Sequence, residues 1–227
     1  MNSRNSPPLN PLPPVVWALA LPMIAMEVAV SLGTSGLAGG AAGVGWRMQA
    51  LERFVFAPEL MRSMLQQGQY PLDQMWRLVT YPFVHASTTH ALFVIVILLA
   101  VGKSVGEVFR GWGVLVLFLG ATLAGAAAYT AVPQIAMPLY GGYPPVYGLI
   151  GGLTWLMWQR ALRIGGDRYR AFTLIGFLIG VQLLFTLFGA AGWEIVADVA
   201  GFAAGFALSF VVSPGGLSRI LGRLRQR

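Results

Sequence analysis

The sequence predicts an all-α membrane protein with six transmembrane helices and an amphipathic, helical first external loop. Three observations indicate this class. The 227 residues are 56% hydrophobic and 10% charged, whereas an ordinary soluble domain is about 25% charged. The mean hydropathy is +0.69. Finally, six apolar segments approach the ~20 residues that a helix needs to cross about 30 Å of hydrocarbon.

The predicted spans cover residues 14–33, 88–106, 112–132, 144–162, 171–190 and 194–212. Each is expected to be helical, because lipid offers no hydrogen-bond partners to an open strand. The first segment has an apolar core longer than the ~7–15 residues of a signal peptide, so we expect an uncleaved helix. We interpret residues 14–212 as one membrane domain between an N-terminal tail (1–13) and a basic C-terminal tail (213–227).

The distribution of Lys and Arg predicts the orientation of the chain. With an even number of spans, both ends of the chain lie on one side of the lipid bilayer. Most of the basic residues fall on that side: Arg4, Lys103, Arg110, Arg160, Arg163, Arg168, Arg170, Arg219, Arg223, Arg225 and Arg227. The positive-inside rule then places both termini in the cytoplasm, in a bacterial-type inner membrane. This pattern accounts for the net charge of +7 without a nucleic-acid partner.

The long external loop at 34–87 carries its own helical pattern. Apolar residues recur at helical spacing on either side of Pro58: Trp46, Met48, Leu51, Phe54 and Val55 before it, then Leu60, Met61, Met64 and Leu65. The pattern predicts two short amphipathic helices broken at Pro58, lying in the outer membrane interface. A loop packed against the helix bundle would produce the same pattern, so both interpretations stay open.

Ionisable residues inside a span are costly and are the first candidates for function. Glu27 lies near the outer end of the first span, where we expect it to reach toward water. His85 and His90 flank the start of the second span, and Asp198 lies in the first turns of the sixth. A metal site is not expected, because histidines five residues apart share a helix face poorly and the chain lacks HExxH and cysteine. Ser87 is too close in sequence to either histidine for a typical nucleophile–base pair, and no cofactor is expected.

Small residues predict where helices approach closely. The sixth span contains Gly201, Ala204 and Gly205, and the fourth contains Gly148, Gly151 and Gly152. Such positions matter because apolar area gives no driving force for association between helices in lipid. We expect Gly201 and Gly205 to serve helix packing.

Several segments share a pattern with a known protein family. They are residues 76–85 (WRLVTYPFVH) followed by His90, Gly106-Glu107 with Gly111, residues 141–149 (GGYPPVYGL) and residues 197–205 (ADVAGFAAG). Together with six spans and a long first loop carrying Trp46-Arg47, they resemble the rhomboid intramembrane serine proteases. The similarity extends from about Trp76 to Val211 and implies the rhomboid fold.

The catalytic positions depart from the family pattern. Rhomboid proteases have a serine nucleophile at the start of the fourth helix and a histidine base on the sixth, and these positions hold Tyr143 and Asp198. The glycine after the serine is replaced by Pro144, which has no N–H. The asparagine that helps to bind the oxyanion is replaced by Val94, so His90 alone remains of that set.

The resemblance therefore implies a pseudoprotease, which binds a transmembrane helix or a membrane protein complex without cleaving it. Two alternatives stay open: an active serine-type protease with atypical residues, and an accessory structural subunit of a larger membrane complex. A channel or transporter is less well supported, because no span carries a run of polar groups. If the helices meet as in the family, the Tyr143 hydroxyl is expected to hydrogen-bond the Asp198 carboxylate.

Overall fold

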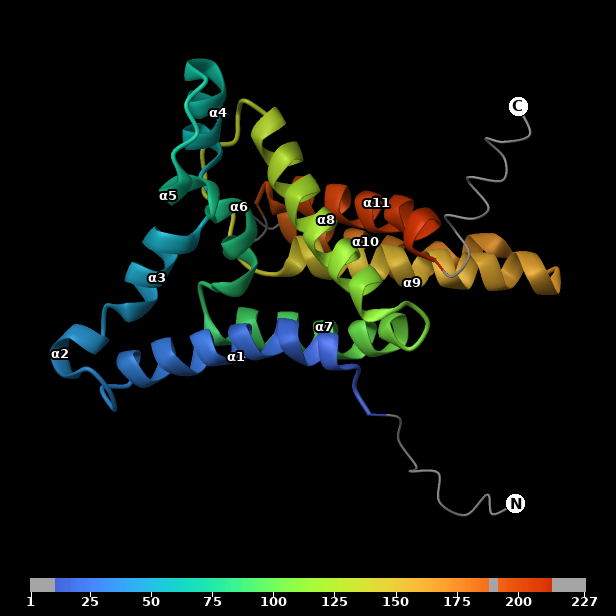
Figure 1. Ribbon diagram of the computed structural model, residues 1–227, viewed down its shortest axis with the longest axis horizontal. Helices are drawn as coiled ribbons and strands as arrows, with labels where there is room; N and C mark the ends of the chain where they lie inside the picture. Colours follow the sequence, from blue (N-terminus) through green and yellow to red (C-terminus); the bar gives the residue numbers. More distant parts are fainter. Residues whose placement is uncertain (1–10, 188–191, 214–227) are drawn as a thin grey trace, which may run out of the picture.

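The computed structural model describes residues 11–187 and 192–213, which are almost entirely helical (Figure 1). The long helices are α1 (Pro14–Thr34), α7 (Thr88–Gly106), α8 (Gly111–Ala131), α9 (Tyr143–Ile164), α10 (Thr173–Leu187) and α11 (Glu194–Val212). Each begins at or close to the start of a predicted span. The last residues of the fifth predicted span lie outside the described residues.

The shorter helices lie mainly between α1 and α7. They are α2 (Gly40–Gly43), α3 (Trp46–Phe54), α4 (Pro58–Gln67), α5 (Leu72–Met75), α6 (Arg77–Thr80), the 3₁₀ turn η2 (Tyr81–Phe83) and, before α10, the 3₁₀ turn η3 (Arg168–Phe172). Within the described ranges, the one strand-like pairing is an antiparallel bridge between Phe56 and Leu139. Its two backbone hydrogen bonds, of 2.9 and 2.8 Å, join the first loop to the segment before α9.

Four described helices, α1, α7, α8 and α11, are long and apolar enough to cross a membrane. This finding supports the predicted class of integral membrane protein. α9 has 22 residues but includes two prolines and two arginines, and α10 has 15 described residues. The count of six spans therefore stays a prediction.

Helix α9 lies at the centre of the bundle, in contact with α11, α8 and α7 (Figure 1). Every residue from 144 to 152 is buried, so protein surrounds the N-terminal half of α9. Glycines bring α9 and α11 together. A Cβ atom at Gly201 would collide with the Pro144 backbone, and one at Gly205 with the Gly148 backbone.

The loop between α1 and α7 packs against α8. Met61 and Met64 of α4 are buried in a cluster with Tyr81, Ala126 and Tyr129. The guanidinium of Arg62 donates to three backbone carbonyls at the end of α8 and just after it: Thr130 (3.1 Å), Val132 (3.3 Å) and Ile135 (2.6 Å). The contacts of α4 thus agree with the packed-loop interpretation, and the interfacial position of this loop stays a prediction.

Candidate functional site

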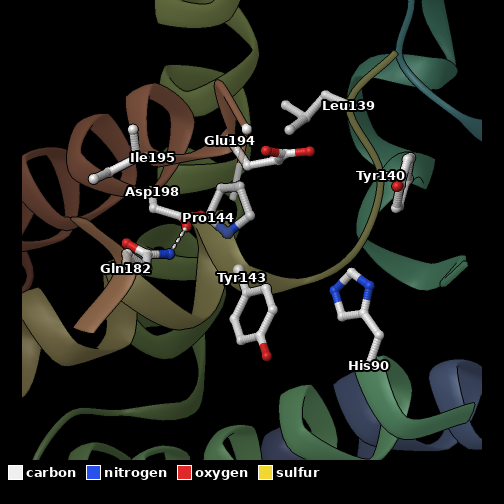
Figure 2. Close-up of a pocket in the computed structure, with 10 residues that line it drawn as sticks. His90, Leu139, Tyr140, Tyr143, Pro144, Gln182, Glu194, Ile195 and Asp198 are labelled. Atoms are coloured by element: carbon white, nitrogen blue, oxygen red, sulfur yellow. Dashed lines mark hydrogen bonds between the residues drawn. The ribbon is translucent and has the colours of Figure 1, made fainter. Parts of the chain in front are cut away.

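A cavity of about 230 Å³ lies where α7, α9 and α11 begin (Figure 2). Its lining includes His90 from α7, Tyr143 and Pro144 from α9, Gln182 from α10, and Glu194 and Asp198 from α11. The structure therefore brings together the three polar positions that the sequence singled out, namely His90, Tyr143 and Asp198.

His90 is held by aromatic and backbone contacts. The side chain of Ser87 caps α7 by accepting a hydrogen bond from the His90 backbone N–H (3.2 Å). The imidazole stacks on Tyr143, with ring centroids 5.0 Å apart and planes 16° apart, and it meets His85 edge-on at 5.0 Å. Gly141 lies against the imidazole with φ +87°, and a Cβ there would collide with the ring, so this position requires glycine. The Nε2 atom of His90 is buried without a hydrogen-bond partner.

Asp198 is 1% exposed, and its carboxylate accepts a hydrogen bond from a residue of α10. The amide nitrogen of Gln182 donates to Asp198 Oδ2 at 2.7 Å (Figure 2), whereas Asp198 Oδ1 has no hydrogen-bond partner. The sequence reasoning missed Gln182 because it considered ionisable residues only. The available signal was a single amide in the α10 sequence TLIGFLIGVQLLFTL, which is apolar apart from that amide and two threonines.

The predicted hydrogen bond between Tyr143 and Asp198 is wrong. Asp198 Oδ1 has no partner, and Oδ2 accepts from Gln182. The Tyr143 hydroxyl points away from Asp198 (Figure 2). The physical reason is that the Tyr143 ring stacks on His90 and meets Tyr147 edge-on at 6.5 Å, so its contacts hold it on the other side of the cavity.

Two positions at which the chain departs from the rhomboid pattern, Val94 and Pro144, offer no hydrogen-bond donor. Val94 is fully buried within the apolar core, and a Cβ at Gly142 would collide with its Cγ1 atom. Pro144, the second residue of α9, has no N–H to donate. The cavity retains the His90 imidazole and the Asp198 carboxylate, while neither the buried Val94 nor Pro144 supplies a donor for a developing negative charge.

A second polar cluster joins α1, α3 and the start of α7. The Arg47 guanidinium donates to both carboxylate oxygens of Glu27, at 2.7 and 3.0 Å, and to the His85 carbonyl at 3.0 Å. Ser31 and Thr88 also donate to the Glu27 carboxylate, at 2.9 and 2.7 Å. The expectation that Glu27 reaches toward water is therefore wrong, because its side chain is 12% exposed and four-fold hydrogen-bonded.

Trp46 fixes the position of Arg47. Its indole lies against the backbone of Gly33 and Gly39, where a Cβ atom would collide with the ring. The adjacent Arg47 can therefore reach back to α1. The membrane-loop pair Trp46-Arg47 thus holds the loop against α1. Neither residue is among those that line the cavity.

His85 connects the cluster to the cavity by lying between them. It is 4% exposed, and its carbonyl accepts from Arg47 while its ring touches that of His90. Burial, followed by the neighbouring His90, lowers the pKa of His85 from 6.5 to about 4. His85 is consequently neutral at physiological pH. Across the described residues, no three His, Asp or Glu side chains are arranged to hold a metal ion.

The fold and the site together define an integral membrane protein with a helical bundle around a central, glycine-packed helix. A family model described as the Rhomboid domain matches residues 72–215. That range covers more than half of the chain, and the protein belongs to the rhomboid family. Among curated proteins, none matches the chain significantly.

Proposed function

We propose that this protein is a rhomboid pseudoprotease that binds a transmembrane helix, or a membrane protein complex, without cleaving it. One observation carries the proposal. The cavity at the start of α7, α9 and α11 contains His90, but no Ser, Thr or Cys is among the described residues that line it. A serine-type protease needs a nucleophile within hydrogen-bond reach of its base.

The residues at the catalytic positions do not replace the missing chemistry. A tyrosine hydroxyl, with an ordinary pKa near 10, is a weak nucleophile unless a base takes its proton. Asp198 is bonded to Gln182, and the Tyr143 hydroxyl is turned away from it. With Val94 in place of the asparagine, His90 is the one side chain left of the set that would stabilise the charge of a tetrahedral intermediate, and Pro144 has no N–H to donate. Such stabilisation usually contributes more to the rate of acyl transfer than any other single effect.

The proposal predicts a protein that binds a helix and leaves it intact. Purified protein is expected to show no covalent labelling by a fluorophosphonate probe, because no serine is among the described residues that line the cavity with His90. A fluorescent transmembrane peptide reconstituted with it is expected to bind, as measured by energy transfer, and to keep its full length by mass spectrometry.

An active rhomboid protease, reconstituted in the same lipid, is the positive control for labelling and cleavage. Labelling of this protein that disappears on mutation of one serine, or peptide fragments that disappear in His90→Ala, would refute the pseudoprotease function. Those results would support the active-protease alternative.

We further propose a bacterial-type inner membrane location with both termini in the cytoplasm, supported by the Lys and Arg distribution. Gly68 ends α4 at φ +67° and is exposed, so an inserted reporter is tolerated there. Alkaline phosphatase, which is active only in an oxidising compartment, is expected to be active when inserted at residue 68 and inactive when fused to the C-terminus. The reverse pattern of activity would overturn this topology.

A further inference from the structure

The cavity at the start of α7, α9 and α11 is lined by two carboxyl groups, and no described cation pairs with either of them. Glu194 and Asp198 both line it, and no Lys or Arg is among the lining residues that the structure describes. The ion pairs between described residues are Arg47 with Glu27 and Arg170 with Asp167, both elsewhere. Two like charges facing one cavity repel each other, and a cation between them would relieve that repulsion.

Asp198 provides the strongest indication that the cavity receives a ligand. Its side chain is 1% exposed, it lines the cavity, and Oδ1 has no hydrogen-bond partner among the described residues. Buried polar atoms in native structures almost always have a partner, and buried charges are paired. The amide of Gln182 satisfies Oδ2 alone. A hydrogen-bond donor from outside the described residues would give Asp198 Oδ1 the partner that it lacks.

The other lining groups also suit a cationic donor. The rings of Tyr140 and Tyr143 line the same cavity, and the face of an aromatic ring attracts ammonium and guanidinium groups. The buried Nε2 atom of His90 has no partner, and a neutral imidazole nitrogen can accept a hydrogen bond.

The size and position of the cavity indicate which cation fits. A volume of about 230 Å³ lies below the ~300–1,000 Å³ of small-molecule pockets, which suits one side chain better than a whole ligand. The cavity lies at the first turns of three helices, and by the predicted topology these turns lie near the outer membrane surface. Lys and Arg near the end of a transmembrane helix direct their charges toward that region.

We propose that this cavity binds the Lys or Arg side chain of a client transmembrane helix, near the outer end of that helix, and that Asp198 is the main partner of its charge. This inference rests on the proposed function as a binder of transmembrane helices. It adds a rule for recognition: the carboxylate of Asp198, at the position of the family's catalytic base, selects client helices that carry a positively charged side chain.

The test uses the full-length protein in nanodiscs of phosphatidylglycerol, a lipid without an ammonium group. The probes are three fluorescent Leu/Ala transmembrane peptides: one with a lysine near the outer end, one with glutamine at that position, and one with the lysine near the inner end. The outer-lysine peptide is expected to bind about 10- to 100-fold more tightly than the other two, as for desolvated charge pairs. The inner-lysine peptide controls for attraction to the anionic lipid.

Asp198→Asn keeps the size of the side chain and is expected to remove most of this preference, whereas Glu194→Gln removes a smaller part. Glu59→Gln, at an exposed position on α4, is the matched control and should keep the full preference. Equal binding of all three peptides to the wild-type protein would overturn the charge rule while leaving helix binding intact. Absence of binding by every peptide would instead contradict the proposed function itself.

Ethanolamine headgroups are the other source of an ammonium group. Adding phosphatidylethanolamine to the nanodiscs is expected to leave the lysine preference within a few-fold of its value. If the preference disappears in that lipid but returns in its absence, a headgroup occupies the cavity, and the proposal of a client side chain is overturned.

Discussion

Replacing Arg47 with methionine is expected to lower the free energy of unfolding by about 3–5 kcal/mol, as for other buried ion pairs broken on one side. The Arg47 and Glu27 side chains are 18% and 12% exposed, so solvent screens their interaction little. The substitution would leave the Glu27 carboxylate without its cation. It would also remove the donor to the His85 carbonyl, which joins the loop to the start of α7.

Thermal or denaturant unfolding in mild detergent measures this loss. The chain supplies a matched control in Arg170, whose ion pair with Asp167 spans 3.7 Å between side chains that are 86% and 53% exposed. Arg170→Met is expected to change stability little, as for most surface pairs. Adding Glu27→Gln to Arg47→Met should recover part of the loss. Equal effects of the two arginine substitutions would contradict a structural role for the Glu27–Arg47 pair.

The Glu27–Arg47 ion pair shows what could be predicted from the sequence and what could not. Glu27 is conspicuous as a carboxylate within an apolar segment, and Arg47 belongs to the loop motif named by the resemblance. Their pairing could not be predicted, because 20 residues and several turns separate them in the chain. It depends on how Trp46 packs against Gly33 and Gly39, which is tertiary structure that residue spacing does not encode.

The helices were more predictable than the site. Apolar runs, bounded by prolines, glycines and charges, set the ends of α1, α7 and α11 to within one residue of the predicted spans. This works because every backbone polar group in lipid must be satisfied within its own helix. α9 follows the rule least: protein covers its N-terminal half, so this helix can retain Tyr143 and Pro144 at its start.

Within the cavity, sequence position identified the residues but not their partners. Tyr143 and Asp198 line the same cavity, as the resemblance implied. Stacking on His90 sets the direction of the Tyr143 ring. The Asp198 carboxylate accepts its hydrogen bond from Gln182 instead of from Tyr143. Both outcomes depend on side-chain packing across helices, for which a single sequence carries no periodic signal.

The glycine contact between α9 and α11 leads to the second large expected effect. Gly205→Ala should lower the free energy of unfolding by about 3 kcal/mol, at the upper end of the range for overpacked cores. The added Cβ would overlap the backbone of Gly148 rather than a side chain, so it cannot be accommodated by a change of rotamer. The two helices would have to separate, and the close approach on which association in lipid depends would be lost.

Gly180 is the matched control, because it lies within α10 and a Cβ there meets nothing within 4 Å. Gly180→Ala should leave stability unchanged or raise it slightly, since alanine favours the helix. Unfolding in detergent measures both variants, and equal stabilities would contradict a close glycine contact. Because α9 carries Tyr143 and α11 carries Asp198, separating these helices would also widen the cavity. Gly205→Ala is therefore expected to weaken peptide binding as well as stability, whereas a loss of stability with unchanged binding would place the binding site elsewhere.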